Sequence, residues 1–207
     1  MKPLYRIGHT LCRTVAYLGF SFKAYGQENL IEDGPAIIAS NHQSYLDPPM
    51  IGICCRRDLH FLTRKSLLEK PLIGPLLGQL NTVPVDRDRG DISAFKAILR
   101  ILQSGNRLII FPEGTRSSDG NLQPPRAGIG MVIAKTRAPV IPARVFGTFE
   151  ALPRTGGLKL RPVTVVFGPP LRFEKEEFPA NDRELYQRLS DRVMGEIAKL
   201  QLPPERR

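Results

Sequence analysis

The feature that most restricts the possible folds is a series of short apolar runs separated by segments with helical periodicity. The run Ala-Ile-Ile-Ala at 36–39 is continuous and carries no polar residue. Such a run is typical of a strand buried on both faces, as in a sheet covered by helices on each side. Further strands are predicted at 59–62, 82–85, 108–111, 140–145 and 163–167, and helices at 48–54, 67–80 (broken by prolines), 92–102, 127–136 and 181–200. Because predicted strands and helices alternate, we expect an α/β fold, with Pro142 marking an edge strand or a bulge.

The chain is long enough for one domain with a substantial core. It has 207 residues, of which 42% are apolar and 24% are charged. These are ordinary values for a globular protein, so disorder is disfavoured. Its 30 Lys and Arg residues exceed its 20 Asp and Glu residues, which gives a net charge of +10. We therefore expect an anionic partner, such as nucleic acid, a phosphorylated substrate or a lipid surface.

The motifs of several enzyme classes are missing from the sequence. There is no Gly-x-Ser-x-Gly elbow, no Walker loop, no Gly-x-Gly-x-x-Gly fingerprint after a strand, and no Cys/His spacing suited to zinc. Hydrolase, nucleotide-binding and metal-dependent functions are therefore disfavoured. Cys12, Cys54 and Cys55 form no paired disulfide framework, which favours a reducing compartment.

The first 22 residues predict an amphipathic helix. Apolar side chains recur there every three or four positions, opposite a basic face. The apolar positions are Leu4, Ile7, Leu11, Val15, Leu18 and Phe22, and the basic positions are Lys2, Arg6, His9 and Arg13. Such a helix either lies at a membrane surface, with its cations among anionic headgroups, or docks on the core of its own domain. The segment alone leaves both settings open. We predict an amphipathic helix at 1–23 and a single domain at 24–207.

The chain is not expected to cross a bilayer. A spanning helix needs about 18 consecutive apolar residues, and Arg13, Lys23 and several prolines interrupt every candidate stretch. Arg13 also falls in the region that a signal peptide keeps apolar, and no small-x-small cleavage site follows it. We expect this segment to remain in the mature protein.

Polar residues cluster directly after the predicted strands, where ligands of α/β sheets bind. The first cluster follows the strand at 36–39 and contains His42 and Asp47. A histidine can accept a proton near neutral pH, and a carboxylate five residues on can return across a turn to fix its tautomer. Alternatively, Asp47 caps the helix that Pro48 starts, and the histidine is only hydrogen-bonded. The two roles of Asp47 are compatible, so the pair is a candidate general base with its orienting partner.

Two cations follow other predicted strands. Arg87 lies among acidic residues in the segment 86–91, after the strand at 82–85. A guanidinium group there can bind a phosphate through two hydrogen bonds, or the segment can be a solvated turn with weak surface ion pairs. Lys65 follows the strand at 59–62 and either reaches an anionic headgroup or stays a solvated charge.

The third polar cluster is the segment Phe-Pro-Glu-Gly-Thr-Arg-Ser at 111–117. Gly114 permits left-handed dihedral angles and close approach of the backbone to a ligand. Its amides, together with Thr115 and Arg116, can form an anion cradle. Taken alone, the segment could equally be a tight turn, in which Glu113 orients Arg116 or holds the loop.

Four motifs occur in order along the chain: Asn41-His42-x-x-x-x-Asp47, Val85-Asp86-Arg87, Phe111-Pro112-Glu113-Gly114-Thr115-Arg116-Ser117 and Val140-Ile141-Pro142. In this order they resemble the 1-acylglycerol-3-phosphate acyltransferase family over residues 41–142. The resemblance implies a mixed α/β domain lying against a membrane, in which His42 is the base and Asp47 its partner. With that context we predict that the helix at 1–23 is membrane-associating. The implied substrate-binding residues are Arg87, Glu113, Gly114 and Arg116. We add Thr115 and Lys65 to these candidates, because both can contact an anionic headgroup.

The implied reaction moves a fatty acyl group from acyl-coenzyme A or acyl carrier protein to the free hydroxyl of 1-acylglycerol 3-phosphate, forming phosphatidic acid. The hydroxyl must lose its proton as its oxygen attacks, and a well-placed imidazole supports that step. A thioester is already activated, so we expect no metal, no cofactor and no acyl-enzyme. The expected partners are the lysophospholipid, the acyl thioester and an anionic membrane surface, not nucleic acid. The expected location is the cytoplasmic face of the cell membrane, peripheral or monotopic.

Two alternatives remain open. The first is the same chemistry on another lysophospholipid or on an amino-lipid, because the three polar segments do not distinguish among headgroups. The second is a non-catalytic basic module that binds an anionic membrane or nucleic acid, which the net charge alone supports.

Overall fold

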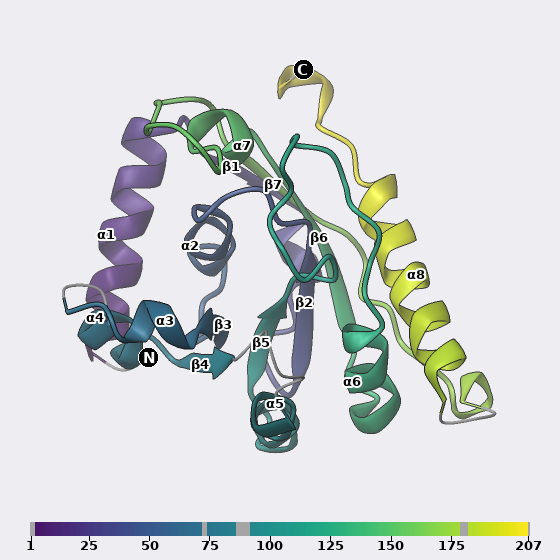
Figure 1. Cartoon of the computed structure of the whole chain (residues 1–207). Helices are drawn as coiled ribbons and strands as arrows, with labels where there is room; N and C mark the ends of the chain where they lie inside the picture. Colours follow the sequence, from purple (N-terminus) through teal and green to yellow (C-terminus); the bar gives the residue numbers. More distant parts are fainter. Residues whose placement is uncertain (1–2, 72–73, 86–91, 179–181, 207) are drawn as a thin grey trace.

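A mixed five-stranded sheet forms the centre of the fold (Figure 1). The computed structural model describes residues 3–71, 74–85, 92–178 and 182–206. The strands lie in the order β1-β7-β6-β2-β5, with bounds β1 (Lys23–Tyr25), β2 (Ala36–Ser40), β5 (Arg107–Ile110), β6 (Val140–Phe146) and β7 (Thr164–Phe167). β2 is parallel to both β5 and β6, whereas β7 is parallel to β1 and antiparallel to β6. The predicted mixed α/β sheet is confirmed.

Two further strands continue the sheet beyond β5. β3 (Phe61–Arg64) and β4 (Thr82–Val85) form a parallel pair. A bridge between His60 and Leu108 joins this pair to β5, where the His60 N–H donates to the Arg107 carbonyl at 3.0 Å. The strand predicted at 59–62 begins two residues later than expected, because His60 pairs only at this bridge.

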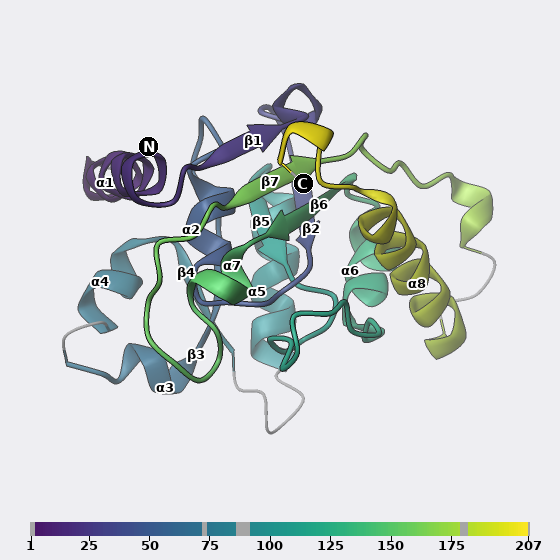
Figure 2. The ribbon, with the colours of Figure 1, turned by 90° about the horizontal axis from the view of Figure 1, so that it is seen from above.

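Helices cover both faces of the sheet, as Figures 1 and 2 show. α1 and α2 pack on one face, and α5, α6 and α8 pack on the other. The bounds are α1 (Pro3–Gly19), α2 (Asp47–Gly52), α3 (Lys65–Leu68), α4 (Gly74–Gln79), α5 (Ile92–Gln103), α6 (Gly128–Thr136), α7 (Thr148–Ala151) and α8 (Arg183–Lys199). The broken helix predicted at 67–80 is thus two short helices, α3 and α4.

β2 is buried on both faces, as its unbroken apolar run predicts. All five of its residues are buried. Ile38 packs among residues of α1 and α2, and Ile37 packs among residues of α5, α6 and α8. Alternate side chains of a strand point to opposite faces, so this one strand contributes to both hydrophobic cores and is held from both sides.

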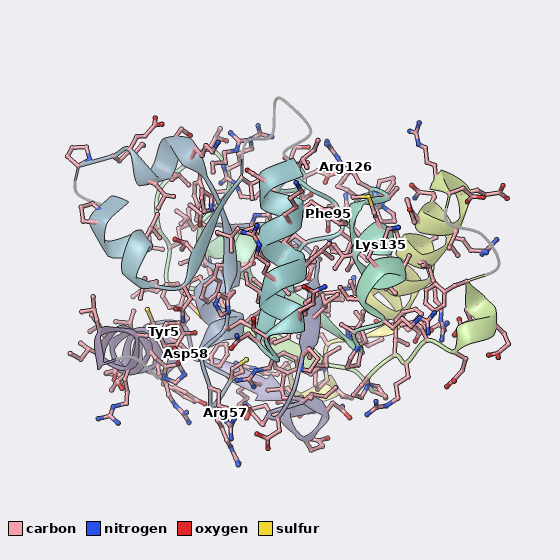
Figure 3. All side chains as sticks on the ribbon, turned by 90° about the horizontal axis from the view of Figure 1, so that it is seen from below. Tyr5, Arg57, Asp58, Phe95, Arg126 and Lys135 are labelled. Carbon is pink, nitrogen blue, oxygen red and sulfur yellow. The ribbon has the colours of Figure 1, made fainter. Side chains whose placement is uncertain are left out.

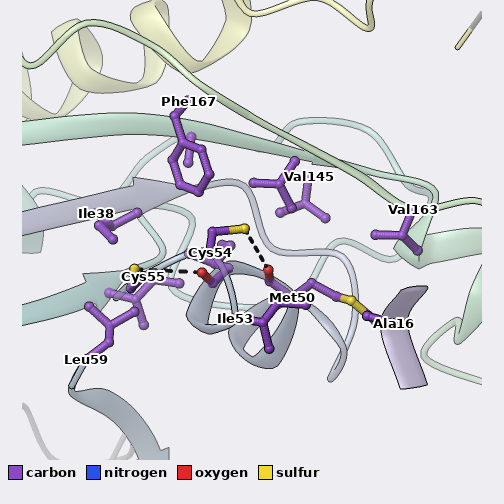
Figure 4. Packing of buried hydrophobic residues seen from close by; sticks show 14 of the residues in the cluster. Ala16, Ile38, Met50, Ile53, Cys54, Cys55, Leu59, Val145, Val163 and Phe167 are labelled. Carbon is purple, nitrogen blue, oxygen red and sulfur yellow. Dashed lines mark hydrogen bonds between the residues drawn. The ribbon is translucent and has the colours of Figure 1, made fainter. Parts of the chain in front are cut away.

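The core between the sheet and α2, shown in Figure 4, contains two of the three cysteines. The thiol of Cys54 donates to the Met50 carbonyl at 3.3 Å, and that of Cys55 donates to the Ile51 carbonyl at 3.8 Å. Burial raises the pKa of both thiols, that of Cys55 to about 12. Both side chains therefore act as small apolar groups.

Pro142 lies inside β6, which is a central strand and not an edge strand. Ala143 pairs with Phe167, whereas Val140 pairs with Leu171. The segment after β7 therefore holds one extra residue between these two pairs, which is a β-bulge. The bulge falls at Pro142, which has no N–H to donate, and it confirms the second of the two predicted settings of this proline.

Helix α1 docks on the domain by one side only. Tyr5 and Ala16 are buried, and the Tyr5 hydroxyl accepts the Leu59 N–H at 3.2 Å. Figure 3 shows Tyr5 on the side of α1 that faces the domain. His9 is half-buried and hydrogen-bonds the Cys55 carbonyl at 3.2 Å, so this member of the predicted basic face contacts the domain. The docked side of α1 therefore carries the Tyr5 hydroxyl, the His9 imidazole and the small side chain of Ala16.

Most of the predicted apolar stripe of α1 faces outward. Ile7 is 64% exposed, Leu11 is 63% exposed and Leu18 is 84% exposed, whereas Phe22, beyond the end of the helix, is buried. One face of the helix is docked on the domain and an apolar face is uncovered, so docking is confirmed for one face and membrane contact stays a prediction. Lys2 lies outside the described residues, and the division of the chain at residue 23 stays a prediction. No helix of the described ranges is long and apolar enough to span a bilayer.

Candidate active site

The predicted functional residues gather at one edge of the sheet. β2 lies between β5 and β6 and is parallel to both, so the carboxyl ends of these three strands meet there. The segments that leave the three strands carry His42, Glu113 and Thr148. This is the edge at which ligands of parallel sheets bind.

His42 and Asp47 form a buried pair. His42 Nδ1 lies 2.8 Å from Asp47 Oδ2, and the exposed fractions of the two residues are 7% and 0%. The same carboxylate oxygen accepts the backbone N–H of Gln43 at 2.6 Å and that of Ser44 at 2.7 Å. Because an ionised carboxylate only accepts hydrogen bonds, Nδ1 carries the hydrogen in this contact, and in the neutral imidazole Nε2 keeps the lone pair.

The other carboxylate oxygen of Asp47 is held by a residue that is distant along the chain. Thr148 Oγ1 donates to Asp47 Oδ1 at 2.6 Å, and Thr148 is fully buried. It is the first residue of α7, just after Gly147, whose φ of 84° turns the chain away from β6. No sequence motif marks Thr148, and 101 residues separate it from Asp47.

Asp47 is not the helix cap that its position before Pro48 suggests. α2 begins at Asp47 itself, and Leu46 precedes it without a side-chain cap hydrogen bond. The carboxylate turns back to the loop at 42–44 and across to Thr148. The capping alternative is therefore wrong, because those donors occupy both oxygens.

The imidazole of His42 stacks on Phe111, the residue that follows β5. Their ring centroids lie 3.9 Å apart with an interplanar angle of 15°. Asp47 holds Nδ1 and Phe111 covers one face of the ring, while Nε2 forms no hydrogen bond with any described residue. Among the residues that the structure describes, Nε2 is thus the ring nitrogen left without a partner.

Asn41 ties the end of β2 to β6. Its Nδ2 donates to the Val145 carbonyl at 3.0 Å, and its Oδ1 accepts the Val145 N–H at 2.8 Å. The side chain reproduces the two bonds that a backbone partner would form, so it extends the ladder beyond β2. This contact fixes the start of the loop that carries His42.

Glu113 supports the same loop from the segment after β5. Its Oε1 accepts the backbone N–H of His42 at 3.2 Å, and its Oε2 is buried with no partner among the described residues. Burial raises the pKa of Glu113 to about 7; the His42 N–H opposes this shift and the charge of Asp47 adds to it. Of the two predicted roles, Glu113 holds the loop, since no ion pair with Arg116 exists in the described ranges.

The residues after Glu113 carry a half-buried cation, Arg116. Gly114 has φ 70°, and a Cβ there would lie 2.8 Å from Arg126 Cδ, so the turn needs glycine. The Arg116 guanidinium carbon lies 3.7 Å from the centre of the Tyr45 ring. Arg116 forms no ion pair and Thr115 no side-chain hydrogen bond with the described residues. No carboxylate of the described ranges therefore neutralises this guanidinium.

One predicted residue, Lys65, is not joined to this cluster. Lys65 is an exposed residue at the start of α3, and no hydrogen bond or ion pair links its side chain to another described residue. Arg87 lies outside the described residues. The assignment of both to a substrate site stays a prediction.

The fold and the site together define a class: an α/β domain with a buried histidine–aspartate pair at the carboxyl edge of its parallel strands and no hydrolase elbow in its sequence. The family model described as Acyltransferase matches residues 21–145, more than half of the chain. The chain belongs to the Acyltransferase family.

Three proteins similar to this chain are named for one activity. A chloroplastic 1-acyl-sn-glycerol-3-phosphate acyltransferase of Arabidopsis thaliana is 31% identical over 80% of this chain, which spans 48% of that protein. The 1-acyl-sn-glycerol-3-phosphate acyltransferase of Bacillus subtilis is 27% identical over 91% of this chain and 96% of its own length. The crystal structure of the lysophosphatidic acid acyltransferase PlsC of Thermotoga maritima superposes with a TM-score of 0.72 and 25% identity, covering 96% of this chain and 81% of that one.

Glu113→Gln is expected to change the pH dependence of stability. The pKa of Glu113 is raised from 4.5 to about 7 in the folded chain, so the folded state binds this proton more tightly than the unfolded state. The free energy of unfolding therefore falls as pH rises through this window, by up to about 3 kcal/mol. Glu113→Gln cannot titrate, so its stability relative to the native chain should rise over the same window.

Urea unfolding between about pH 5 and about pH 8 measures this difference. Glu184→Gln, which changes an exposed carboxylate on α8, is the control and should follow the native chain. Parallel pH curves for Glu113→Gln and the native chain would contradict the titration of a buried Glu113.

Thr148→Val is expected to destabilise the fold by about 1–3 kcal/mol, because it leaves a buried oxygen of Asp47 without its donor. Thr148→Ser keeps the hydroxyl and should recover most of this loss. Thr10→Val is the matched control, since the exposed Thr10 hydroxyl bonds only the Arg6 carbonyl of its own helix. Equal urea midpoints for Thr148→Val and Thr10→Val would show that the Thr148–Asp47 hydrogen bond does not stabilise the fold.

Proposed function

We propose that this protein transfers a fatty acyl group from a thioester to the free hydroxyl of 1-acylglycerol 3-phosphate, forming phosphatidic acid and a free thiol. One observation carries the proposal: Asp47 holds His42 Nδ1, which leaves Nε2 as an open proton acceptor beside the edge of the sheet. Family membership supports it, since the relatives in Arabidopsis thaliana and Bacillus subtilis are named for this activity.

His42 acts as the general base in the proposed reaction. Nε2 takes the proton of the lysolipid hydroxyl as that oxygen attacks the carbonyl carbon of the thioester. The carbon–sulfur bond then breaks, and the proton passes from Nε2 to the leaving sulfur, so an ester and a thiol form and His42 is restored. A positioned imidazole contributes about 10²–10⁴-fold to such a step. Asp47 stabilises the imidazolium that forms in between.

The acyl group passes directly from donor to acceptor in this proposal. The two serines closest in sequence to His42 have other partners: Ser40 Oγ donates to Asn41 Oδ1 at 3.3 Å, and Ser44 Oγ donates to the Leu152 carbonyl at 2.7 Å. Neither is therefore disposed as a nucleophile for Nε2 to activate. Acyl-coenzyme A or acyl carrier protein is the donor substrate, and no resident cofactor is required because a thioester is already activated.

Arg116 binds the phosphate of the acceptor in the proposed complex. Its guanidinium lies over Tyr45, three residues beyond His42, and it has no carboxylate partner among the described residues. A planar guanidinium can bind a phosphate through two hydrogen bonds. Thr115 and the Gly114 backbone lie beside it, and we propose that Arg87 and Lys65 complete this phosphate site. This arrangement would anchor the headgroup while the hydroxyl meets His42.

The proposed location is the cytoplasmic face of the cell membrane, as a peripheral or monotopic protein. The lysophospholipid acceptor and its product are both bilayer lipids. The uncovered apolar face of α1 and the net charge of +10 suit an anionic membrane surface.

His42→Ala is expected to reduce turnover by at least about 100-fold, because the hydroxyl proton loses its acceptor. Thiol release from acyl-coenzyme A or acyl carrier protein, with lysophosphatidic acid as acceptor, measures turnover. His9→Gln is the control, since the only hydrogen bond of the His9 side chain in the described ranges is to the carbonyl of Cys55, a residue that follows α2. Undiminished thiol release in a folded His42→Ala would reject the general base. No release from the native chain with either donor would reject the proposed activity and favour the non-catalytic basic module.

Arg116→Ala is expected to raise the KM for lysophosphatidic acid about tenfold or more with little change in kcat, since it removes a charged hydrogen bond to the phosphate. Arg100→Ala, an exposed arginine on α5, is the control. Steady-state kinetics with lysophosphatidic acid and with lysolipids that lack a terminal phosphate measure the effect. Equal kcat/KM for the different headgroups, unchanged by Arg116→Ala, would assign the chain to another lysolipid or an amino-lipid.

A further inference from the structure

The exposed large apolar side chains are concentrated in two segments. Among the described residues nine such side chains are exposed, and seven of them lie on α1 or in the loop at 152–162 that connects α7 to β7. The α1 members are Ile7, Leu11, Val15, Tyr17 and Leu18, and the loop members are Leu158 and Leu160. A concentration of this kind marks an interaction surface, whereas scattered exposed residues do not.

The two segments form one face of the molecule. Leu160 Cδ2 lies 3.4 Å from the position of a Cβ on Gly19, the last residue of α1. The Val163 N–H, at the end of the loop, donates to the Phe20 carbonyl at 2.9 Å. Figures 1 and 2 both show the loop next to the end of α1 that leads into β1. We name this surface, formed by the α1 stripe with Leu158 and Leu160, the apolar face.

Only positive charge accompanies the apolar face. Residues 1–27 and residues 151–163 contain no Asp or Glu, although the chain has 20 of them. The loop carries Arg154, Lys159 and Arg161, all exposed and none in an ion pair with a described residue. Exposed leucines among unpaired cations are complementary to a bilayer with anionic headgroups.

The loop is also joined to the residues that hold Asp47. The Ala151 carbonyl at the end of α7 accepts the Lys159 N–H at 2.7 Å, and the Leu152 carbonyl accepts the Ser44 hydroxyl. An open groove beside α7 is lined by Phe149, Glu150, Pro153, Lys159 and Arg161. α7 begins at Thr148, the partner of Asp47, so a lipid at this groove is close to the candidate active site.

We propose that the loop at 152–162 is a second membrane-contact element, in which Leu158 and Leu160 enter the acyl boundary while Arg154, Lys159 and Arg161 bind lipid phosphates. Together with α1, the loop orients the groove beside α7 toward the leaflet that supplies the acceptor. The inference rests on the proposed function, since a lipid acceptor gives this orientation its purpose.

The charge pattern favours a bilayer over a second copy of the chain. A symmetric dimer brings the same patch of both copies together. The apolar face would then place Arg154, Lys159 and Arg161 against their own equivalents with no acidic residue in either segment. Like charges facing each other are unfavourable, whereas anionic lipid neutralises them.

The first test measures binding to vesicles of phosphatidylcholine with and without phosphatidylglycerol. The double variant Leu158→Asp with Leu160→Asp is expected to partition at least about tenfold more weakly than the native chain. Ile92→Asp is the matched control, because Ile92 is 70% exposed but lies at the start of α5. Lys159→Ala with Arg161→Ala should weaken binding only to vesicles that contain phosphatidylglycerol.

The second test measures depth and does not depend on losing binding. The chain has no Trp, so Leu158→Trp places a single tryptophan in the loop. Its emission is expected to shift to the blue on vesicle binding and to be quenched by lipids brominated in their acyl chains. Ile92→Trp should show neither change. Unquenched, unshifted emission of vesicle-bound Leu158→Trp would overturn the insertion of the loop.

A third measurement separates this inference from the proposed function. Thiol release with a monomeric short-chain lysophosphatidic acid does not require a membrane, so the Leu158→Asp, Leu160→Asp double variant should retain native turnover there and lose turnover on vesicles. Native vesicle binding by this variant would overturn the inference while leaving the enzyme assignment intact. A native dimer that dissociates in the variant would also overturn it and assign the face to a second copy. Inactivity of the native chain on the monomeric lipid would instead count against the proposed function.

Discussion

The rest of the site depends on one buried carboxylate. Asp47 has no solvent exposure, yet its two oxygens accept hydrogen bonds from an imidazole, two backbone amides and the Thr148 hydroxyl. A buried carboxylate is costly unless such donors surround it. The loop after β2, the start of α2 and the start of α7 are therefore coupled, because each contributes to the environment of this single group.

Three parallel strands make this coupling possible. β2 lies between β5 and β6 in parallel register, so the segments that leave the three strands emerge side by side. Glu113 from the β5 side and Thr148 from the β6 side reach the loop that carries His42 and Asp47 from opposite directions. Hydrophobic cores on both faces of β2 hold the strands in place, which gives the polar edge a rigid support.

α1 shows how one helix can serve two surroundings. Its docked side is formed by Tyr5, His9 and Ala16, and its most apolar side chains are left outside. The loop at 152–162 extends this uncovered side, since Leu160 lies beside Gly19. At the other end of the loop, the Leu152 carbonyl accepts the hydroxyl of Ser44, which lies in the same loop as His42. In the proposed function, the surface that meets the lipid and the residues that act on it belong to one connected unit.

Local pattern alone determined the strands β2 and β4, the helices α5 and α8 to within a few residues, and the return of Asp47 to His42, because each depends on residues close together along the chain. Only the tertiary structure decided the rest. β1, three partly exposed residues, exists because β7 pairs with it. The contacts of Asn41 with Val145 and of Asp47 with Thr148 join residues more than a hundred positions apart. Hydropathy predicted the apolar stripe of α1 but not the side by which the helix docks. That side depends on the hydrogen bonds of Tyr5 and His9 to Leu59 and Cys55, which only the packed structure brings into reach.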